Sequence, residues 1–259
     1  SVNQMVGMSG KGAYPSINKS DVASIQIPLP PLEVQKEIVA EIEGYQKVID
    51  GARAVLENYR PHIPIHPDWP MVELSEVCES ITDGDHQAPP KSDSGIPFVT
   101  ISNMTAENRL DFSKTFFVPK EYFFNLKDNR KPKQGDILYS VTGSYGLPVL
   151  VDFDKEFCFQ RHIGLIRTAA KLDERFLFAL LLTPFMKKQA DDSATGVAQK
   201  TVSLRAIRKF KVPLPSLKEQ QAIVAEIEAE QALVAANREL IARFEEKTRQ
   251  TIARVWGDA

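Results

Sequence analysis

Cysteine is scarce in this chain, and its scarcity excludes two kinds of scaffold. Only two cysteines occur among 259 residues, Cys78 and Cys158, and they form no C-x-x-C pair. Disulfide-rich domains and structural zinc sites both need more cysteines at closer spacing. The four histidines show no metal-ligand spacing either. We therefore expect a protein of the reducing cytoplasm that has no metal or other cofactor of its own.

Long apolar runs and a secretion signal are also lacking. The longest apolar run covers residues 176–182, whereas a membrane-spanning helix needs about 20 apolar residues. No charged, then apolar, then small-residue signal peptide opens the chain. The sequence thus predicts no membrane partner.

Catalytic signatures are missing as well. Residues 9–16 contain glycines and a lysine but lack the spacing of a phosphate-binding loop. No G-x-S-x-G or H-E-x-x-H pattern occurs, and residues 88–91 lack the polar and aromatic members of an amino-methyltransferase motif. The acidic cluster at residues 152–154 suits a strand-end turn better than a nuclease site. We therefore predict no catalytic residue.

No charge of one sign dominates. Lysine and arginine number 32 against 34 aspartate and glutamate, for a net charge of −2. A strongly basic nucleic-acid binder is excluded by composition alone, although residues 69–216 carry slightly more basic than acidic side chains. The charge by itself indicates ordinary solvated surfaces.

What the chain does contain is an internal repeat. Residues 25–43 recur as residues 210–228 at an offset of 185 without a gap, and the six residues from Ile38 to Glu43 are identical to those from Ile223 to Glu228. Each copy begins with a short alternating strand and two prolines, which force an extended turn. Ser216 and Glu219 then have the spacing of a helix-capping box.

A long helix follows each proline turn. The first is expected to end by Arg60, before a proline-rich loop, and the second to run from Leu217 to about Trp256. Apolar residues step by four and three along both, as in a coiled coil. An alternative is that both helices only cover the central domain. The predicted coiled-coil seam consists of Ile38, Ile42, Tyr45, Ile49, Leu56, Ile223, Ile227, Val234, Ile241 and Phe244.

The region between the two repeats has a different pattern of predicted secondary structure. Short β-type segments at 96–101, 136–141, 149–153 and 158–167 are separated by turn residues, and a helix is predicted from Asp173 to about Lys188. A short helix at 203–209 leads into the second repeat. The expected fold class is α+β, with a mixed α/β domain flanked by two long coiled-coil helices.

The loops of this region are rich in side chains that can hydrogen-bond. Such side chains contact base edges and phosphates in DNA complexes, although any single loop could be ordinary surface. The predicted DNA-binding residues are Thr82, Asp83, His86, Gln87, Lys91, Ser102, Asn103, Ser140, Thr142, Ser144, Tyr145, Arg161, His162, Gln199, Lys200 and Thr201.

The order of these motifs resembles the DNA specificity subunit of type I restriction–modification systems. The resemblance covers nearly the whole chain and is most specific in two places, Thr195-Gly with Gln199-Lys-Thr-Val and the terminal segment from Val212. It implies target-recognition domains that each read one half of a split DNA site, held apart by paired helices. It also implies a subunit without catalytic activity, which docks modification subunits that use S-adenosylmethionine and, through them, a restriction subunit.

The chain departs from that pattern because it has two helical regions but only one complete recognition domain. By the resemblance, residues 1–24 are the tail of a preceding recognition domain, 25–68 the first helical spacer region, 69–209 the recognition domain and 210–259 the second spacer region. The chain could be a natural half-subunit or a C-terminal fragment of a longer subunit. A half-subunit would be expected to self-associate as a homodimer.

Two other function classes stay open from the residues alone. The chain could be a coiled-coil adaptor whose central domain binds a protein or peptide, which cross-linking at the Gly143 loop would reveal. It could also be an enzyme acting on nucleic acid, which incubation with DNA, Mg²⁺ and S-adenosylmethionine would reveal. We expect double-stranded DNA to be the ligand, and neither cleavage nor methyl transfer by the chain alone.

Overall fold

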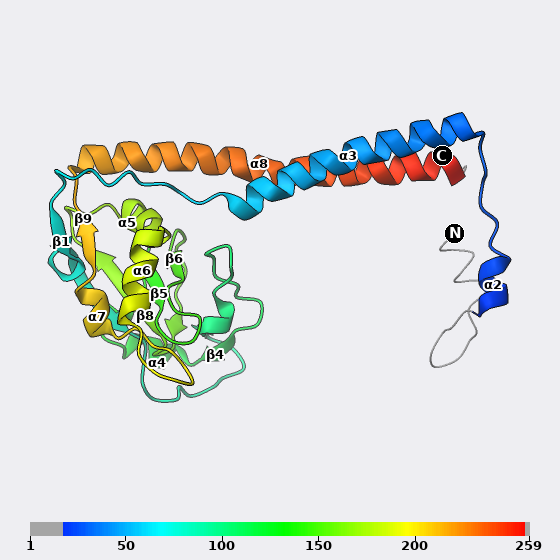
Figure 1. Cartoon of the computed structure of the whole chain (residues 1–259). Coiled ribbons are helices and arrows are strands. Elements are labelled where there is room, and N and C mark those ends of the chain that lie inside the picture. The colour runs from blue at the N-terminus through cyan, green and yellow to red at the C-terminus, as the bar shows by residue number, and fades with distance from the viewer. Residues whose placement is uncertain (1–17, 257–259) are drawn as a thin grey trace. The chain divides into compact units, whose positions relative to one another are not determined.

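A computed structural model describes residues 18–256 and divides the chain into two compact units (Figure 1). Among the described residues, one unit comprises 18–59 with 232–256, and the other comprises 60–231. Helices and strands are both abundant, which confirms the predicted α+β class. Among the helices that the structure describes, none is both long and apolar enough to cross a membrane.

The first unit is a pair of antiparallel helices preceded by a short one. Its elements are α2 (Lys19–Ala23), α3 (Leu32–Asn58) and the C-terminal part of α8 (Leu217–Trp256). Ile49 and Ala52 of α3 are buried. The rings of Tyr45 and Phe244 meet edge to face, with centroids 5.4 Å apart. Tyr45 of α3 and Phe244 of α8 thus contact each other across the helix pair.

Polar contacts fix the alignment of these two helices. Glu41 accepts hydrogen bonds from Tyr45 (2.6 Å), from the buried hydroxyl of Thr251 (3.1 Å) and from Arg254 (3.0 Å). The hydrogen bond from Tyr45 is the main cause that lowers the pKa of the Glu41 carboxyl. A sliding of one helix along the other would break this group of contacts, so they select one register.

The second unit contains three small sheets. The four-stranded sheet has the order β2-β8-β5-β6, the three-stranded sheet the order β4-β3-β7, and β1 pairs with β9. Every pairing is antiparallel except that of β3 with β7. The strands are β1 (Met71–Glu73), β2 (Cys78–Asp83), β3 (Ile96–Val99), β4 (Phe116–Val118), β5 (Ile137–Ser140), β6 (Pro148–Leu150), β7 (Cys158–Phe159), β8 (Ile163–Thr168) and β9 (Lys211–Pro213).

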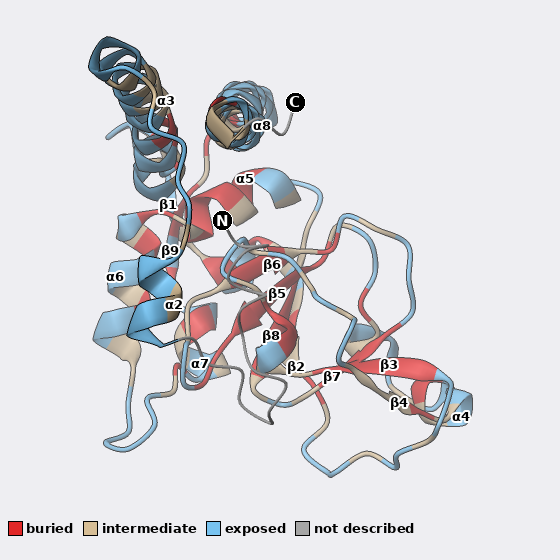
Figure 2. Ribbon diagram, turned by 90° about the vertical axis from the view of Figure 1, so that its right-hand side faces the viewer, coloured by how far each residue is buried: buried red, intermediate tan, exposed pale blue. Residues whose placement is uncertain are grey.

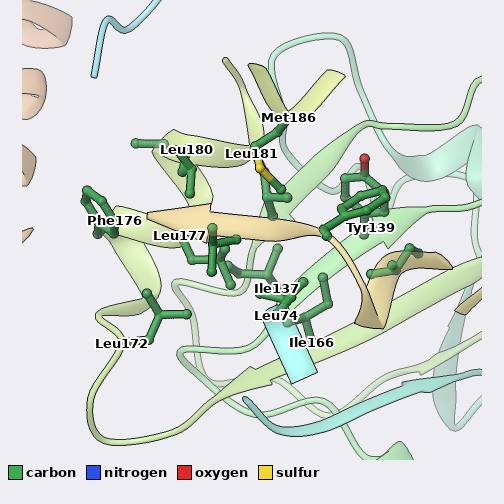
Figure 3. Packing of buried hydrophobic residues seen from close by; sticks show 14 of the residues in the cluster. Leu74, Ile137, Tyr139, Ile166, Leu172, Phe176, Leu177, Leu180, Leu181 and Met186 are labelled. Carbon is green, nitrogen blue, oxygen red and sulfur yellow. The ribbon is translucent and has the colours of Figure 1, made fainter. Parts of the chain in front are cut away.

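Four helices belong to this unit besides the first turns of α8, and buried residues concentrate in α5 and the central strands (Figure 2). They are α4 (Lys120–Phe124), α5 (Glu174–Leu181), α6 (Pro184–Ser193) and α7 (Leu204–Arg208). In the main core, Phe176 and Leu177 of α5 lie near Ile137 and Ile166 of the four-stranded sheet (Figure 3). Each such buried side chain contributes about 1.5–3 kcal/mol.

The structure corrects two predicted elements. The single helix expected from Asp173 to about Lys188 is two helices, because Pro184 lacks an amide hydrogen and Thr183 caps a new helix there. The single strand expected over residues 158–167 is β7 and β8, with a turn at Arg161 and His162 between them.

A third correction concerns the predicted helix seam. Val224 and Ile227 are buried in the main core of the second unit, and Ile223 packs against that core. The first turns of α8 thus lie on the mixed domain. We therefore remove Ile223 and Ile227 from the predicted coiled-coil seam and assign them to this core.

The internal repeat is visible in the elements themselves. Helix α3 begins at Leu32 and α8 at Leu217, which are equivalent positions. Helices α2 and α7 also correspond residue for residue, and Asn18 and Ser203 cap them at equivalent positions. The capping box predicted for α8 is present, since the Ser216 amide donates to Glu219 (2.9 Å) and the Glu219 amide donates to the Ser216 hydroxyl (3.3 Å).

Candidate functional site

Several of the polar loops start from one edge of the four-stranded sheet. Asp83 at the end of β2 pairs with Gly164, and Ser140 at the end of β5 pairs with Ile163. Because β2 and β5 both run antiparallel to β8, their C-terminal ends lie beside the start of β8. The loops that follow β2 and β5, and the turn that precedes β8, therefore gather at this edge.

A segment distant in sequence joins the same edge. The Gly143 amide donates to the Lys200 carbonyl (3.0 Å), and Thr142 forms a bridge with Thr201. Thr195 and Thr201 exchange two backbone hydrogen bonds of 2.9 and 2.8 Å. These bonds fold residues 195–201 back on themselves beside the turn after β5. We call residues 82–87, 140–145, 160–162 and 195–201 together the loop edge.

Helix α6 holds Tyr145, which lies just beyond the tip of the turn after β5. The Tyr145 hydroxyl donates to Asp191 (2.8 Å), and the Lys187 ammonium lies 4.6 Å from the ring centroid while pairing with Asp191. Lys187 first, and Tyr145 second, lower the pKa of Asp191. Since its hydroxyl is engaged within the chain, Tyr145 positions the turn; the predicted role of a direct DNA contact would need this bond to break.

The start of the loop after β2 is anchored by residues of the segment 122–130. Asp83 accepts from Arg130 (3.4 Å) and contacts His86 (2.9 Å), and the Thr82 hydroxyl donates to the Asn129 carbonyl (2.7 Å). The Tyr122 hydroxyl similarly donates to Asp85 (3.0 Å). The predicted contacts Thr82 and Asp83 thus brace the loop.

Hydrogen bonds also set the charge of Asp85. Burial alone would raise the pKa of its carboxyl, but bonds from the Gln87 amide and the Tyr122 hydroxyl lower that pKa below the usual value. A stable carboxylate next to β2 gives this loop a fixed negative charge. The exposed side chains here that can donate hydrogen bonds are His86 and Gln87 within the loop and Lys91 beyond it.

The structure corrects two further predicted contacts because their polar groups are used internally. Asn103 is buried, accepts from the Thr100 amide (2.9 Å) and donates to the Asp111 carbonyl (3.0 Å). Ser140 is buried, donates to the Ser144 carbonyl (2.7 Å) and accepts from the Leu147 amide (2.9 Å). Both hold loop conformations and present no polar group at the surface.

The remaining predicted residues divide by exposure. Thr142 is buried, whereas Thr201 and His162 are partly buried. The exposed set contains amide, cationic, imidazole and hydroxyl groups, which are those that bind base edges and phosphates. It comprises His86, Gln87, Lys91, Ser102, Ser144, Arg161, Gln199 and Lys200.

The sequence did not indicate the residues that position these loops. Tyr122, Arg130, Lys187 and Asp191 all lie outside the predicted set, although they bond to it. Of these, only the pairing of Lys187 with Asp191 could have been expected from the sequence, because oppositely charged residues four apart on a helix are neighbours. Tyr122 and Arg130 come from a segment with no recognisable pattern.

A metal centre and a nucleophilic cysteine are the two other chemistries that such residues could support. Among residues 18–256, no group of three or more histidine, cysteine, aspartate or glutamate side chains could hold a metal ion. Burial raises the pKa of Cys78 and of Cys158 to about 12. Both thiols are therefore protonated near neutral pH and are poor nucleophiles.

Comparison with known proteins gives a consistent family. The family model described as "Type I restriction modification DNA specificity domain" matches residues 1–57 and 67–245. The chain is 24% identical over 256 residues to the type I restriction enzyme MjaVIII specificity subunit of Methanocaldococcus jannaschii, covering 86% of this chain and 59% of that protein. It is 24% identical over 243 residues to the EcoBI specificity subunit of Escherichia coli, covering 78% of this chain and 50% of that protein. The chain thus spans little more than half of these relatives.

Solved structures show the same fold. A chain from a type I R-M system, studied for complex assembly and conformational transition, aligns with a TM-score of 0.67 at 24% identity and covers 100% of this chain and 68% of its own length. The HsdS subunit from Thermoanaerobacter tengcongensis aligns with a TM-score of 0.56 at 24% identity, covering 100% of this chain and 67% of its own length.

Proposed function

Because the chain belongs to the family of type I restriction–modification DNA specificity domains, we propose that it is a non-catalytic DNA-recognition and scaffold subunit. In this proposal, residues 69–209 are a target-recognition domain that reads one half of a split DNA target. Methyl transfer and cleavage are carried out by other subunits, and S-adenosylmethionine binds there. We expect the complex to act on double-stranded DNA in the cytoplasm.

The observation that carries this proposal is the convergence of exposed polar side chains at the loop edge. Gln87, Ser144, Arg161, Gln199 and Lys200 are exposed there, and they come from four segments. Backbone bonds and the Tyr145–Asp191 contact hold two of these segments together. A rigid edge that presents several donors and acceptors suits direct readout of base edges.

The helix pair supports a scaffold role. Leu233 and Leu240 of α8 are seven residues apart, and both are exposed, as are Ile252 and Val55. Exposed apolar side chains along a helix commonly mark surfaces that pack against a partner. We infer that modification subunits dock on exposed apolar positions of the first unit, and that a restriction subunit joins through them.

The test is selection of bound duplexes from a random pool by the chain together with its modification subunit. We expect enrichment of a half-site sequence, with affinity that falls steeply as salt rises. Replacing Gln199 by alanine should weaken discrimination between the enriched and a scrambled duplex by roughly tenfold, since a good base contact provides about 1–3 kcal/mol.

Two variants separate sequence reading from general binding. Lys200→Ala should weaken both duplexes alike and reduce the salt dependence, because a lysine–phosphate contact carries no base information. Lys114→Ala, at an exposed position of the second unit outside the loop edge, should change neither. A pool that shows no enriched sequence, or a protein cross-linked at the Gly143 loop with DNA having no effect, would favour the adaptor class instead.

A further inference from the structure

One apolar side chain of the loop edge is surrounded by solvent. Val197 lies in the segment 195–201 and is 106% exposed, whereas Phe124, another exposed apolar residue of the second unit, is 59% exposed. Ala198 beside it is exposed as well. The part of the loop edge that extends furthest into solvent is therefore apolar, although the residues around it are polar or charged.

The segment that carries Val197 is fixed at its base. Thr195 and Thr201 exchange two backbone hydrogen bonds, of 2.9 and 2.8 Å, and the Val202 amide donates to the Val141 carbonyl (2.9 Å). The Gly143 amide donates to the Lys200 carbonyl (3.0 Å). These bonds join the segment to the end of β5 and to the turn that follows β5, so the base of this turn has a defined position on the domain.

The tip of the segment is a tight turn that requires glycine at its first position. Gly196 has a φ of +104°, and a Cβ there would lie 2.5 Å from the Gln199 carbonyl oxygen. Glycine alone adopts this conformation without strain. The backbone thus closes between residues 196 and 199, and Val197 and Ala198 are the residues at the tip.

Gln199 places a hydrogen-bonding group next to this apolar tip. Its side-chain nitrogen lies 3.4 Å from the position that a Cβ of Gly143 would take, so the Gln199 side chain lies along the turn after β5. Gln199 and Lys200 are both exposed. Val197 is therefore two residues from an amide that can contact a base and three residues from a cation that can contact a phosphate.

DNA offers one apolar group that suits such a side chain. The 5-methyl group of thymine lies in the major groove, where glutamine amides also bind the N6 and N7 atoms of adenine. The apolar residues that proteins insert between base steps from the minor groove are phenylalanine, leucine, isoleucine, methionine and proline. Valine next to a glutamine fits the major groove better than it fits a minor-groove wedge.

A protein partner would be the other kind of surface for an exposed valine. Single exposed apolar residues do not form the wide patches that mark protein interfaces, and Thr195, Gln199 and Lys200 around the tip are polar or charged. Lysine is depleted at protein interfaces. The composition of the tip therefore favours DNA.

We propose that Val197 contacts the 5-methyl group of a thymine in the major groove and thereby selects an A·T pair within the half-site. This inference rests on the proposed function and adds one specificity-determining residue to it. A search for hydrogen-bonding side chains could not indicate Val197, because its contribution is apolar.

Replacing thymine by uracil tests the contact, because uracil lacks only the methyl group. The chain with its modification subunit is bound to the enriched duplex, in which each thymine is replaced in turn by deoxyuridine. One replacement should weaken binding by about fourfold, which is the effect of one buried methyl group. Val197→Ala should weaken binding of the thymine duplex by a similar factor and show little further loss with uracil, since both changes remove the same contact.

A matched variant shows whether the effect belongs to this residue. Met71→Ala removes an exposed apolar side chain from β1, which pairs with β9. It should leave the fourfold effect of uracil unchanged. Val197→Ala removes only exposed atoms, so its melting temperature should equal that of the original chain.

Four results would overturn the proposal. They are an enriched half-site without thymine, equal binding of all uracil forms, a uracil effect that persists in full in Val197→Ala, and a Val197→Ala variant that loses only the modification subunit. Each of these leaves DNA recognition by the domain intact. A pool without any enriched sequence would instead contradict the proposed function and this inference together.

Discussion

At the scale of single residues, side chains that hold loops together lie among the side chains that face solvent. The side chains of Asn103 and Ser140 form hydrogen bonds with backbone groups. Those of Gln199 and Lys200 are exposed at the loop edge. Residue type alone could not separate the two classes, because both are polar. A polar side chain turns inward where the loop has buried backbone groups that lack a backbone hydrogen-bond partner. Which groups lack one depends on the conformation of the loop.

Among the described glutamines, Gln220 is the one whose replacement should lower the free energy of unfolding the most. Gln220→Ala leaves the Lys171 carbonyl and the Asp173 amide without their partner, and each buried orphan costs about 1–3 kcal/mol. We expect the free energy of unfolding of the second unit to fall by roughly 2–4 kcal/mol. Urea unfolding measures it, with exposed Gln221→Ala as the control; equal midpoints for the two variants would contradict the assignment.

The two cysteines, of which Cys158 is buried and Cys78 is half-buried, predict a pH dependence. Their folded-state pKa values of about 12 lie above the ordinary value of 9.0. The folded chain therefore keeps these protons at pH values where the unfolded chain has lost them, so their contribution to stability falls as pH rises from about 9 toward 12. Between pH 7 and 8.5 this contribution should be flat.

Thiol labelling checks the same assignment. At pH 8 only about one thiol in ten thousand would be ionised at such a pKa, so a thiolate-specific reagent should label the folded chain very slowly. The chain unfolded in urea should react at both cysteines within the ordinary time for free thiols. Fast labelling of the folded chain would show that Cys78 or Cys158 is less buried than described.

At the scale of elements, the helices followed from the sequence much better than the sheets. The bounds of α3 and α8 were predictable because heptads, prolines and the capping box are local signals. Strands β1, β2 and β4 had no such signal, since they are short and their partners are distant in sequence. The loop edge itself depends on those pairings, so its residues could be named but their convergence could not.

Replacing glycine by alanine should have opposite effects on stability at Gly84, in a loop, and at Gly51, in a helix. A Cβ at Gly84 would lie 2.0 Å from the Phe159 carbonyl oxygen, whereas a Cβ at Gly51 in α3 would meet nothing within 4 Å. Gly84→Ala should therefore destabilise the second unit by about 2 kcal/mol or more, as expected for forced backbone shifts. Gly51→Ala should stabilise α3 by about 0.5–1 kcal/mol. Thermal unfolding monitored by circular dichroism should show a lower melting temperature for Gly84→Ala and a higher one for Gly51→Ala.

At the scale of the whole molecule, the chain consists of a helix pair and a mixed domain with separate cores. Ile49 is 3% exposed within the helix pair, and the main core of the domain is formed by other residues. We expect the two units to respond separately to damage. This separation fits a protein in which one part recognises a ligand and the other carries partners.

Ile49→Asp should unfold the helix pair selectively. A buried unpaired carboxylate costs several kcal/mol, which exceeds what a two-helix core can supply. We expect a loss of helical circular dichroism with the near-ultraviolet signal of the domain retained. Lys47→Asp, at an exposed position of the same helix, should leave both signals unchanged, and joint loss of both signals in Ile49→Asp would show a single cooperative unit.

Helix α8 contributes to both cores, with Val224 and Ile227 in one and Phe244 in the other. A helix extends an ordered end more readily than it nucleates a new one. Any ligand that tightens the recognition domain should therefore also slow fraying of the α8 residues that pair with α3, and a partner bound to the helix pair should act back on the domain by the same coupling free energy. Under the proposed function, α8 is a thermodynamic link through which DNA and protein partners would influence each other's affinity without touching.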